Sequence, residues 1–232
     1  MSMRVWGIGI LVLGFGFVTA SVAGESFEDV SKKIAVAAEK VKSFSAKSKM
    51  VTEMKQEGFS MVSTTEGTTE MLRKGDVFLL RTETKTVTEN VVGGNTSKQE
   101  SAMLMINDGS YTYTVSETGG TKSAFRNKVE KSAADPFEAW RESAELKVLA
   151  DSSLDGHAVW VIEATPKLAQ ATQGKTVICY HKESGQMIKM VVYAPDGKPM
   201  TTTTYSDIKV NEKTSPDRFV FKAPPGVEVQ DS

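Results

Sequence analysis

The sequence has few of the residues that usually build catalytic and metal sites. Its 232 residues include one cysteine, Cys179, and only two histidines, His157 and His181. A single cysteine cannot form an intramolecular disulfide, so a disulfide-stapled scaffold is excluded. Because Cys179 lies deep in the chain, a lipid anchor on a cysteine near the N-terminus is excluded as well.

An excess of charge of either sign is also absent. The chain has 28 basic and 29 acidic residues, a net charge of −1. Nucleic-acid-binding proteins and proteins that bind anionic membranes usually show a clear basic excess. We therefore expect no nucleic-acid partner. With 40% hydrophobic and 25% charged residues, the composition is that of an ordinary globular domain.

The single long hydrophobic run lies at the N-terminus. Arg4 precedes an apolar stretch from Val5 to Val18, and small residues follow up to Gly24. This order is typical of a secretory signal peptide. An uncleaved membrane anchor is the alternative, but the strongly apolar part is shorter than the ~20 residues that a spanning helix needs. The sequence thus predicts a signal peptide over residues 1–24 and an exported single domain over residues 25–232.

Catalytic motifs are missing. There is no Gly-x-Ser-x-Gly nucleophile elbow and no His-Glu-x-x-His zinc helix. Residues 169–176 match a relaxed phosphate-loop pattern, but residues 177–181 after them predict a strand where such a loop needs a helix. Cys179, His181 and His157 could together bind zinc, but no carboxylate lies at ligand spacing. We expect no metal, no cofactor and no enzymatic activity.

Hydrophobic periodicity predicts two helices. The first, over about residues 26–42 with Ser26 as N-cap, is indicated by apolar residues at steps of three and four. These residues are Phe27, Val30, Ile34, Ala37 and Val41. The second is expected in the middle of the chain, with Asp135 as N-cap and Pro136 at the first helical position.

After residue 42 the period changes to two, which predicts strands. Strand-like segments follow one another to the end of the chain, separated by turn sequences. These turns are Lys74–Asp76, Asn107–Gly109, Gly119–Gly120, Leu154–Gly156, Glu183–Gly185 and Pro195–Gly197. The predicted fold class is α+β: a long antiparallel sheet with a leading and a mid-chain helix. Such a sheet must curl or close to hide its apolar face.

Six segments, in the same order, resemble the periplasmic outer-membrane lipoprotein carrier family, the LolA-like proteins. Arg218–Val229 is similar to the C-terminal ending of that family, and Val41–Ala46 to its first helix-to-strand junction. The other four are Leu104–Tyr111, Asp135–Phe137, Ala164–Lys167 and Ala194–Gly197. Together they extend the resemblance over nearly all of residues 25–232.

The resemblance implies a half-open antiparallel β-barrel with lid helices over an apolar cavity. It implies a monomeric periplasmic carrier that shields the acyl chains of lipoproteins on their way to the outer membrane. Its partners would be acylated lipoproteins or other lipids, an inner-membrane release complex and an outer-membrane acceptor. The alternative on the same scaffold is a lipid-binding or envelope-sensing module without carrier activity.

Strand alternation identifies the side chains expected to face this cavity, because each lies on the more apolar side of its strand. They are Phe44, Met50, Met54, Phe78, Leu80, Met105, Trp160, Ile178, Met190 and Val192. The many methionines suit a cavity that adapts to a mobile apolar ligand, although methionine also fills loosely packed cores.

The resemblance also implies an arginine that bonds the lid and holds the empty form closed. Arg73 stands at the matching place, but Lys74 replaces the family's proline, and Arg81 nearby is an alternative. If Arg73 is the latch, its guanidinium should reach backbone carbonyls of the mid-chain helix around residues 136–142. The other interpretation is a solvated charge at a strand end.

Overall fold

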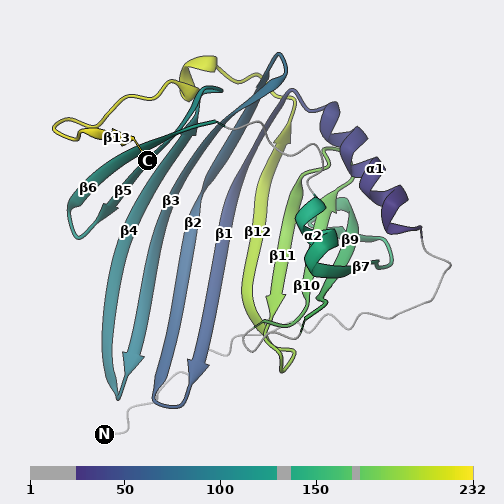
Figure 1. The fold of residues 1–232 in the computed structure, drawn as a ribbon, viewed down its shortest axis with the longest axis horizontal. Helices are drawn as coiled ribbons and strands as arrows, with labels where there is room; N and C mark the ends of the chain where they lie inside the picture. The colour runs from purple at the N-terminus through teal and green to yellow at the C-terminus, as the bar shows by residue number, and fades with distance from the viewer. Residues whose placement is uncertain (1–24, 130–136, 169–172, 232) are drawn as a thin grey trace, which may run out of the picture.

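A computed structural model describes residues 25–129, 137–168 and 173–231 of the chain. They form one large sheet, two α-helices and a short 3-10 helix (Figure 1). The helices are α1 (Phe27–Glu39), α2 (Glu138–Ser143) and the 3-10 helix η1 (Pro216–Phe219). The strands are β1 (Ser43–Gln56), β2 (Phe59–Lys74), β3 (Val77–Val92), β4 (Asn95–Asn107), β5 (Tyr111–Thr118), β6 (Thr121–Lys128), β7 (Ala144–Val148), β8 (Ser152–Leu154), β9 (His157–Pro166), β10 (Thr176–His181), β11 (Met187–Tyr193), β12 (Pro199–Val210) and β13 (Val229–Asp231).

The sheet is a single path of hydrogen-bonded strands. Its order is β13-β6-β5-β4-β3-β2-β1-β12-β11-β10-β9-β7, and β8 pairs with β9 beside that path. All pairs are antiparallel except β13, which runs parallel to β6. Because the described strands β13 and β7 end the path without meeting, the sheet is a half-open barrel, as the sequence predicted.

Strands β1 to β4 are unusually long and extend well beyond the rest of the sheet (Figure 1). Each has 13 to 16 residues, and 16 residues of strand span about 53 Å at ~3.3 Å per residue. All six turns predicted from the sequence join elements here. Two further hairpins, at Gly58 and at Gly93-Gly94, were not among the predictions, and all three glycines have positive φ.

Helix α1 begins as predicted and ends earlier than predicted. The Ser26 hydroxyl accepts a hydrogen bond from the Asp29 amide at 3.2 Å, so the predicted N-cap is confirmed. The helix ends at Glu39, and Val41 therefore leaves the helical stripe. Val41 is buried instead with Phe44 and Ala46, where the chain enters β1.

The mid-chain helix α2 starts later than the sequence predicted. It starts at Glu138, and Phe137 precedes it without a side-chain capping bond. The predicted cap Asp135 and Pro136 lie outside the described residues, as do residues 1–24 of the predicted signal peptide. In the described ranges, no helix has the length and apolar character needed to cross a bilayer.

The main core lies between α1 and the short-strand end of the sheet. Val30, Ile34 and Ala37 of α1 pack with Trp160 and Ile162 of β9. The alternate residues of β9, Val159 and Val161, pack on the other side with Ile188. This strand is therefore buried on both faces, which explains why its sequence is apolar without alternation.

After β12 the chain returns across β3 to β6 (Figure 1). Phe219 in η1 is 1% exposed, and the ring of Phe221 stacks on Tyr113 of β5 with centroids 4.2 Å apart. Arg218 forms an ion pair with Glu70 of β2 at 2.6 Å. The C-terminal segment is thus fixed to the sheet by packing, stacking and charge.

Two neighbouring residues test this attachment. Phe219→Ala should lower the free energy of unfolding by about 3–5 kcal/mol, because it empties a fully buried site. Val220→Ala, at a side chain that is 55% exposed, should change it by less than about 0.5 kcal/mol. Urea denaturation of both variants measures the difference. Equal effects would mean that the segment does not contribute to the core.

Candidate functional site

The strand register divides the sheet into two faces of different chemistry. Residues paired directly across strands share a face, so each row can be followed from strand to strand. One row carries no charge: Thr121, Thr118, Ser101, Thr86, Thr65, Met50, Thr203, Met190, Ile178 and Ile162. The row beside it runs Lys122, Glu117, Ala102, Lys85, Glu66, Lys49, Thr204 and Lys189.

The same division holds along the full length of β1 to β6. On the face that contains Met50, Arg73 is the one charged residue of these six strands, and all their other charged residues lie on the opposite face. We call these the uncharged face and the charged face. The composition is about one quarter charged, so chance would put several charges on each face. The absence of other charged residues from this face of the six strands is therefore not expected by chance.

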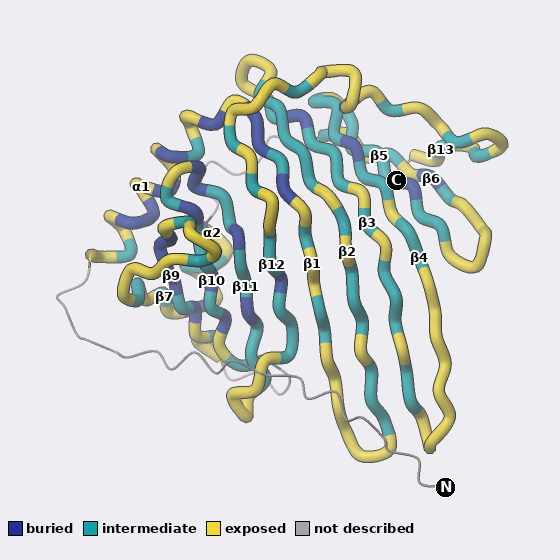
Figure 2. The backbone as a smooth tube through the Cα atoms, turned by 180° about the vertical axis from the view of Figure 1, so that it is seen from behind, coloured by how far each residue is buried: buried dark blue, intermediate teal, exposed yellow. Residues whose placement is uncertain are grey.

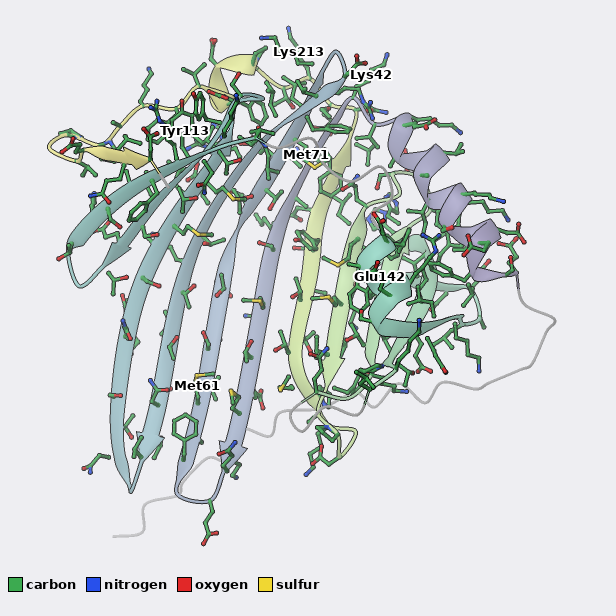
Figure 3. The ribbon with its side chains drawn as sticks, in the orientation of Figure 1. Lys42, Met61, Met71, Tyr113, Glu142 and Lys213 are labelled. Carbon is green, nitrogen blue, oxygen red and sulfur yellow. The ribbon has the colours of Figure 1, made fainter. Side chains whose placement is uncertain are left out.

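The uncharged face combines methionine and aromatic side chains with hydroxyls. Eight methionines of the described strands lie on it, and Figure 3 labels Met61 and Met71 among them. The eight are Met50, Met54, Met61, Met71, Met103, Met105, Met187 and Met190. Threonines fill many positions between them, and Thr65 and Thr86 bond each other across strands at 2.8 Å.

All ten side chains predicted to face a cavity lie on this one face. Their registers connect β1, β2, β3 and β4 on one side and β12, β11, β10 and β9 on the other. Their contact with a ligand stays a prediction. Three of them, Phe44, Trp160 and Ile178, are buried. Phe78, Leu80, Met105, Met190 and Val192 are half-buried, and Met50 and Met54 are the most exposed.

Further residues of the same face were missed by the sequence analysis. Phe59 and Met61 begin β2, Met103 lies in β4, and Phe125 lies in β6. Met103 and Phe125 are exposed, at 38% and 39%. The alternation rule that found Met105 identifies Met103 as well, and the hairpin at Gly58 sets the parity for Phe59 and Met61.

The two helices cover only one end of the uncharged face (Figure 1). Trp160 and Ile162 lie beneath α1, and Trp140 of α2 packs against the same cluster. The rings of Phe27 in α1 and Phe137 pack perpendicular to each other, with centroids 5.3 Å apart. On the uncharged face of the described strands β1 to β6, no helix lies over the long part of the sheet, where intermediate and exposed residues prevail (Figure 2). This part of the uncharged face is therefore open to solvent.

Arg73 bonds a helix, but a different one from the helix predicted. Its Nε donates to the carbonyl of Val41 at 3.1 Å, and its Nη2 donates to the carbonyl of Ala38 at 3.3 Å. Ala38 lies in the last turn of α1 and Val41 follows the end of the helix, so the prediction that Arg73 reaches the mid-chain helix was wrong. Helix ends leave carbonyls without intrahelical partners, and a guanidinium can satisfy two of them at once.

The position of Arg73 also joins α1 to the uncharged face. Its guanidinium lies 4.2 Å from the ring centroid of Phe78, one of the predicted ligand residues. Arg81, the alternative latch, lies on the charged face, where its Nε donates to Glu83 at 2.6 Å and its Nη1 to the carbonyl of Arg218 at 3.2 Å. Of the two arginines, Arg73 is therefore the one that contacts α1.

Cys179, His157 and His181 were considered as zinc ligands in the sequence analysis, and the structure shows how the two histidines are placed. The rings of His157 and His181 meet edge to face with centroids 4.8 Å apart. The Nδ1 of His181 is hydrogen-bonded to the Ser184 hydroxyl at 2.9 Å. In the described ranges no group of three or more metal-ligating residues comes together. Residues 176–181 form strand β10, as predicted, where a phosphate loop would need a helix.

A hollow lies on the charged face. It has a volume of about 810 Å³ and lies between β1 to β6 and Pro224 of the C-terminal segment. Its wall includes Lys47, Glu66, Glu83 and Lys85. Apolar side chains such as Leu104 and Val115 also line it. An acyl chain there would lie beside the charged groups and displace water from them, so we do not assign the ligand to this hollow.

Comparison with known proteins supports the fold. A family model described as "Uncharacterized protein" matches residues 130–223, less than half of the chain. No curated protein matches the sequence. One chain of the Pseudomonas aeruginosa MucA/MucB complex is similar in structure, with 14% identity, a TM-score of 0.50 and coverage of 84% of this chain. The protein spans about 60% of the length of that chain.

Two further similar structures carry the family name. A putative outer membrane lipoprotein-sorting protein domain from Vibrio parahaemolyticus has 14% identity, covers 82% of this chain and 94% of its own, and has a TM-score of 0.35. A LolA superfamily protein from Nitrosomonas europaea has 11% identity, covers 85% and 99%, and has a TM-score of 0.28. The chain resembles LolA-like proteins, as its motifs indicated, and at these identities the likeness concerns the fold alone.

Replacing Arg73 tests its contact with α1. Arg73→Leu removes two charge-assisted hydrogen bonds, each worth about 1.5–3 kcal/mol, so the last turn of α1 should open at least about tenfold more often. Lysine should restore less than arginine because it lacks the planar fork. Hydrogen exchange of the α1 amides measures the opening. Arg81→Leu, on the other face, is the control and should leave that exchange unchanged.

Proposed function

We propose that this protein binds acyl chains of lipids along the uncharged face of its sheet. The observation that carries the proposal is the segregation of charge: one charged residue, Arg73, on this face of six strands. Lysine and glutamate side chains keep the charged face hydrated, whereas the uncharged face carries methionines, aromatic rings and hydroxyls. Contiguous apolar surface on a soluble domain usually marks a binding site.

The open surface suits a lipid that must be passed on. Each CH₂ group removed from water contributes about 0.8 kcal/mol, so a few contacts along a chain already give useful affinity. A ligand on an open face stays partly in water, which keeps the affinity below that of an enclosed pocket. Methionine side chains adapt to mobile chains of different length because they have three rotatable bonds and a polarizable sulfur.

We further propose that the protein is exported, acts in the periplasm as a single domain over residues 25–232, and carries acylated lipoproteins towards the outer membrane. The signal-like N-terminal segment, the LolA-like motifs and the similar lipoprotein-sorting domain support this proposal. A carrier must receive its client from a release complex and surrender it to an acceptor. Phe78, Leu80, Met105, Met190 and Val192 are half-buried on the open face and would contact the client first.

The second candidate is a sensing or binding module. It is favoured by the structural similarity to a chain of the MucA/MucB complex, in which one protein binds another. A sensor would bind lipid without passing it on and would change its affinity for a protein partner. Transfer of an acylated lipoprotein from the protein to acceptor vesicles separates the two: transfer supports the carrier, and stable retention supports the module.

Two adjacent threonines on β2 test where lipid binds. Thr65 lies on the uncharged face and Thr64 on the charged face, and both are half-buried. Thr65→Lys should weaken binding of a fluorescent fatty acid at least tenfold, about 1.4 kcal/mol, because an ammonium group would be desolvated beside the chain. Thr64→Lys should stay within about twofold of the unchanged protein in the same titration.

Two outcomes of this titration would contradict the proposal. If the unchanged protein binds neither the fatty acid nor an acylated lipopeptide, lipid binding itself is wrong. If it binds and Thr64→Lys weakens binding as much as Thr65→Lys, the ligand does not lie on the uncharged face. Circular dichroism of both variants checks that the sheet is intact.

A further inference from the structure

The two histidines of the chain touch each other, although they are 24 residues apart in sequence. His157 begins β9, His181 ends β10, and their ring centroids are 4.8 Å apart. His181 is 4% exposed, and the Nδ1 of its ring is hydrogen-bonded to the uncharged hydroxyl of Ser184. In the described chain no ion pair joins a carboxylate to either ring.

The turn after His181 connects this pair to helix α1. Ser184 is fully buried, and its hydroxyl also accepts from the amide of Gln186 at 3.3 Å. Gly185 has a φ of +65° and lies against α1 so closely that a Cβ atom there would be 2.3 Å from the carbonyl oxygen of Ile34. It would also be 2.9 Å from the amide nitrogen of Ala38. The turn therefore supports the helix directly, backbone against backbone.

We propose that α1 is a pH-gated cover: protonation of His181 loosens the Lys182–Gln186 turn, and α1 then leaves Trp160 and Ile162 of the uncharged face. The opening itself depends only on the histidine pair, the turn and the helix. That it admits lipid to the covered end of the face rests on the proposed function.

The electrostatic surroundings favour the neutral form of His181. Burial lowers its pKa, and the neighbouring His157 lowers it further, whereas Glu183 in the turn raises it. Among the other groups nearby, Lys182 pairs with Asp151, and burial raises the pKa of the Cys179 thiol. Asp155 and Asp207 line a hollow together with His157, and Asp207 pairs with Lys47. From α1, the atoms nearest to Gly185 of the turn are uncharged: the carbonyl oxygen of Ile34, and the amide nitrogen and Cβ of Ala38.

The direction of the pH effect follows from this lowered pKa. An ordinary histidine is protonated below about pH 6.5. The buried ring of His181 in the docked form has a lower pKa and is protonated only at lower pH. As the pH falls below about 6.5, the undocked form therefore binds more protons and gains population. Above pH 7 both forms are neutral, and docking is at its strongest.

The chain provides its own optical probe for the opening. Beyond residue 24 it has two tryptophans, Trp140 and Trp160, and both lie in the cluster under α1. Undocking exposes them to water, which shifts tryptophan emission to longer wavelength. Because the chain has two histidines only, imidazole titration in this range is assigned to a single contacting pair.

The experiment is a titration of residues 25–232 without lipid, from pH 7.5 to pH 5.0. We expect a reversible red shift of tryptophan emission as the pH falls below about 6.5, the pKa of an ordinary histidine. His181→Gln keeps a group that can bond Ser184 but cannot be protonated, and it should abolish the shift. His157→Gln is the matched variant: it removes the ring that lowers the pKa of His181, so the shift should persist at higher pH.

A transition that survives in His181→Gln, or its absence in the unchanged protein down to pH 5.0, would overturn the proposal. If His181→Gln does not fold, NMR of the unchanged protein decides: the α1 amide signals must move with the imidazole signal of His181. In Gly185→Ala the added Cβ should displace α1 already at pH 7.5. Its tryptophan emission at pH 7.5 should therefore match that of the unchanged protein at pH 5.5. Fatty-acid binding, measured separately at pH 7.5, tests the proposed function without depending on this opening.

Discussion

The alternation of side chains along a strand is the constraint on which this molecule depends. Consecutive residues point to opposite faces, so a sequence that alternates charged with uncharged residues over six long strands builds two surfaces at once. On one surface, rows such as Lys122, Glu117, Lys85, Glu66 and Lys49 pair opposite charges across strands. On the other, the same strands offer methionine, phenylalanine and threonine. Water solvates the first well, whereas the second must be covered or occupied.

The protein covers the uncharged face at one end and leaves it open at the other. Helix α1 contributes a narrow stripe of small and branched residues, which is enough for the short strands but not for β1 to β4. Its position is fixed by the packing of Val30, Ile34 and Ala37 on Trp160 and Ile162 of β9. Two local contacts add to this packing, the guanidinium of Arg73 at the C-terminal end of the helix and the close approach of Gly185. Release of the helix, as proposed, would therefore also expose this apolar cluster to water.

The charged face is braced differently. The C-terminal segment packs Phe219 and stacks Phe221 on Tyr113, and Arg218 binds Glu70. This segment holds the strands together from the side that faces water and leaves the uncharged face free. A rigid sheet with one movable helix is what either a carrier or a lipid sensor requires, because both must exchange an apolar ligand while the scaffold persists. The two differ in what happens after binding, which is a question of partners.

The sequence by itself determined which residues share a face. Strand alternation placed Phe44, Met50 and eight further residues together, and the hydrophobic stripe with Ser26 located the start of α1. These features depend on local geometry, which a short stretch of chain already fixes. The motifs likewise indicated a LolA-like half-barrel.

Only the tertiary structure decided what lies over each face. The arginine was identified from sequence, but its partner was not, because the helix end that reaches Arg73 is set by packing between α1 and β9. The contact of His157 with His181 depends on the pairing of β9 with β10. The hollow on the charged face depends on the path of the C-terminal segment. Such contacts join residues far apart in the chain, and no local period encodes the distance between them.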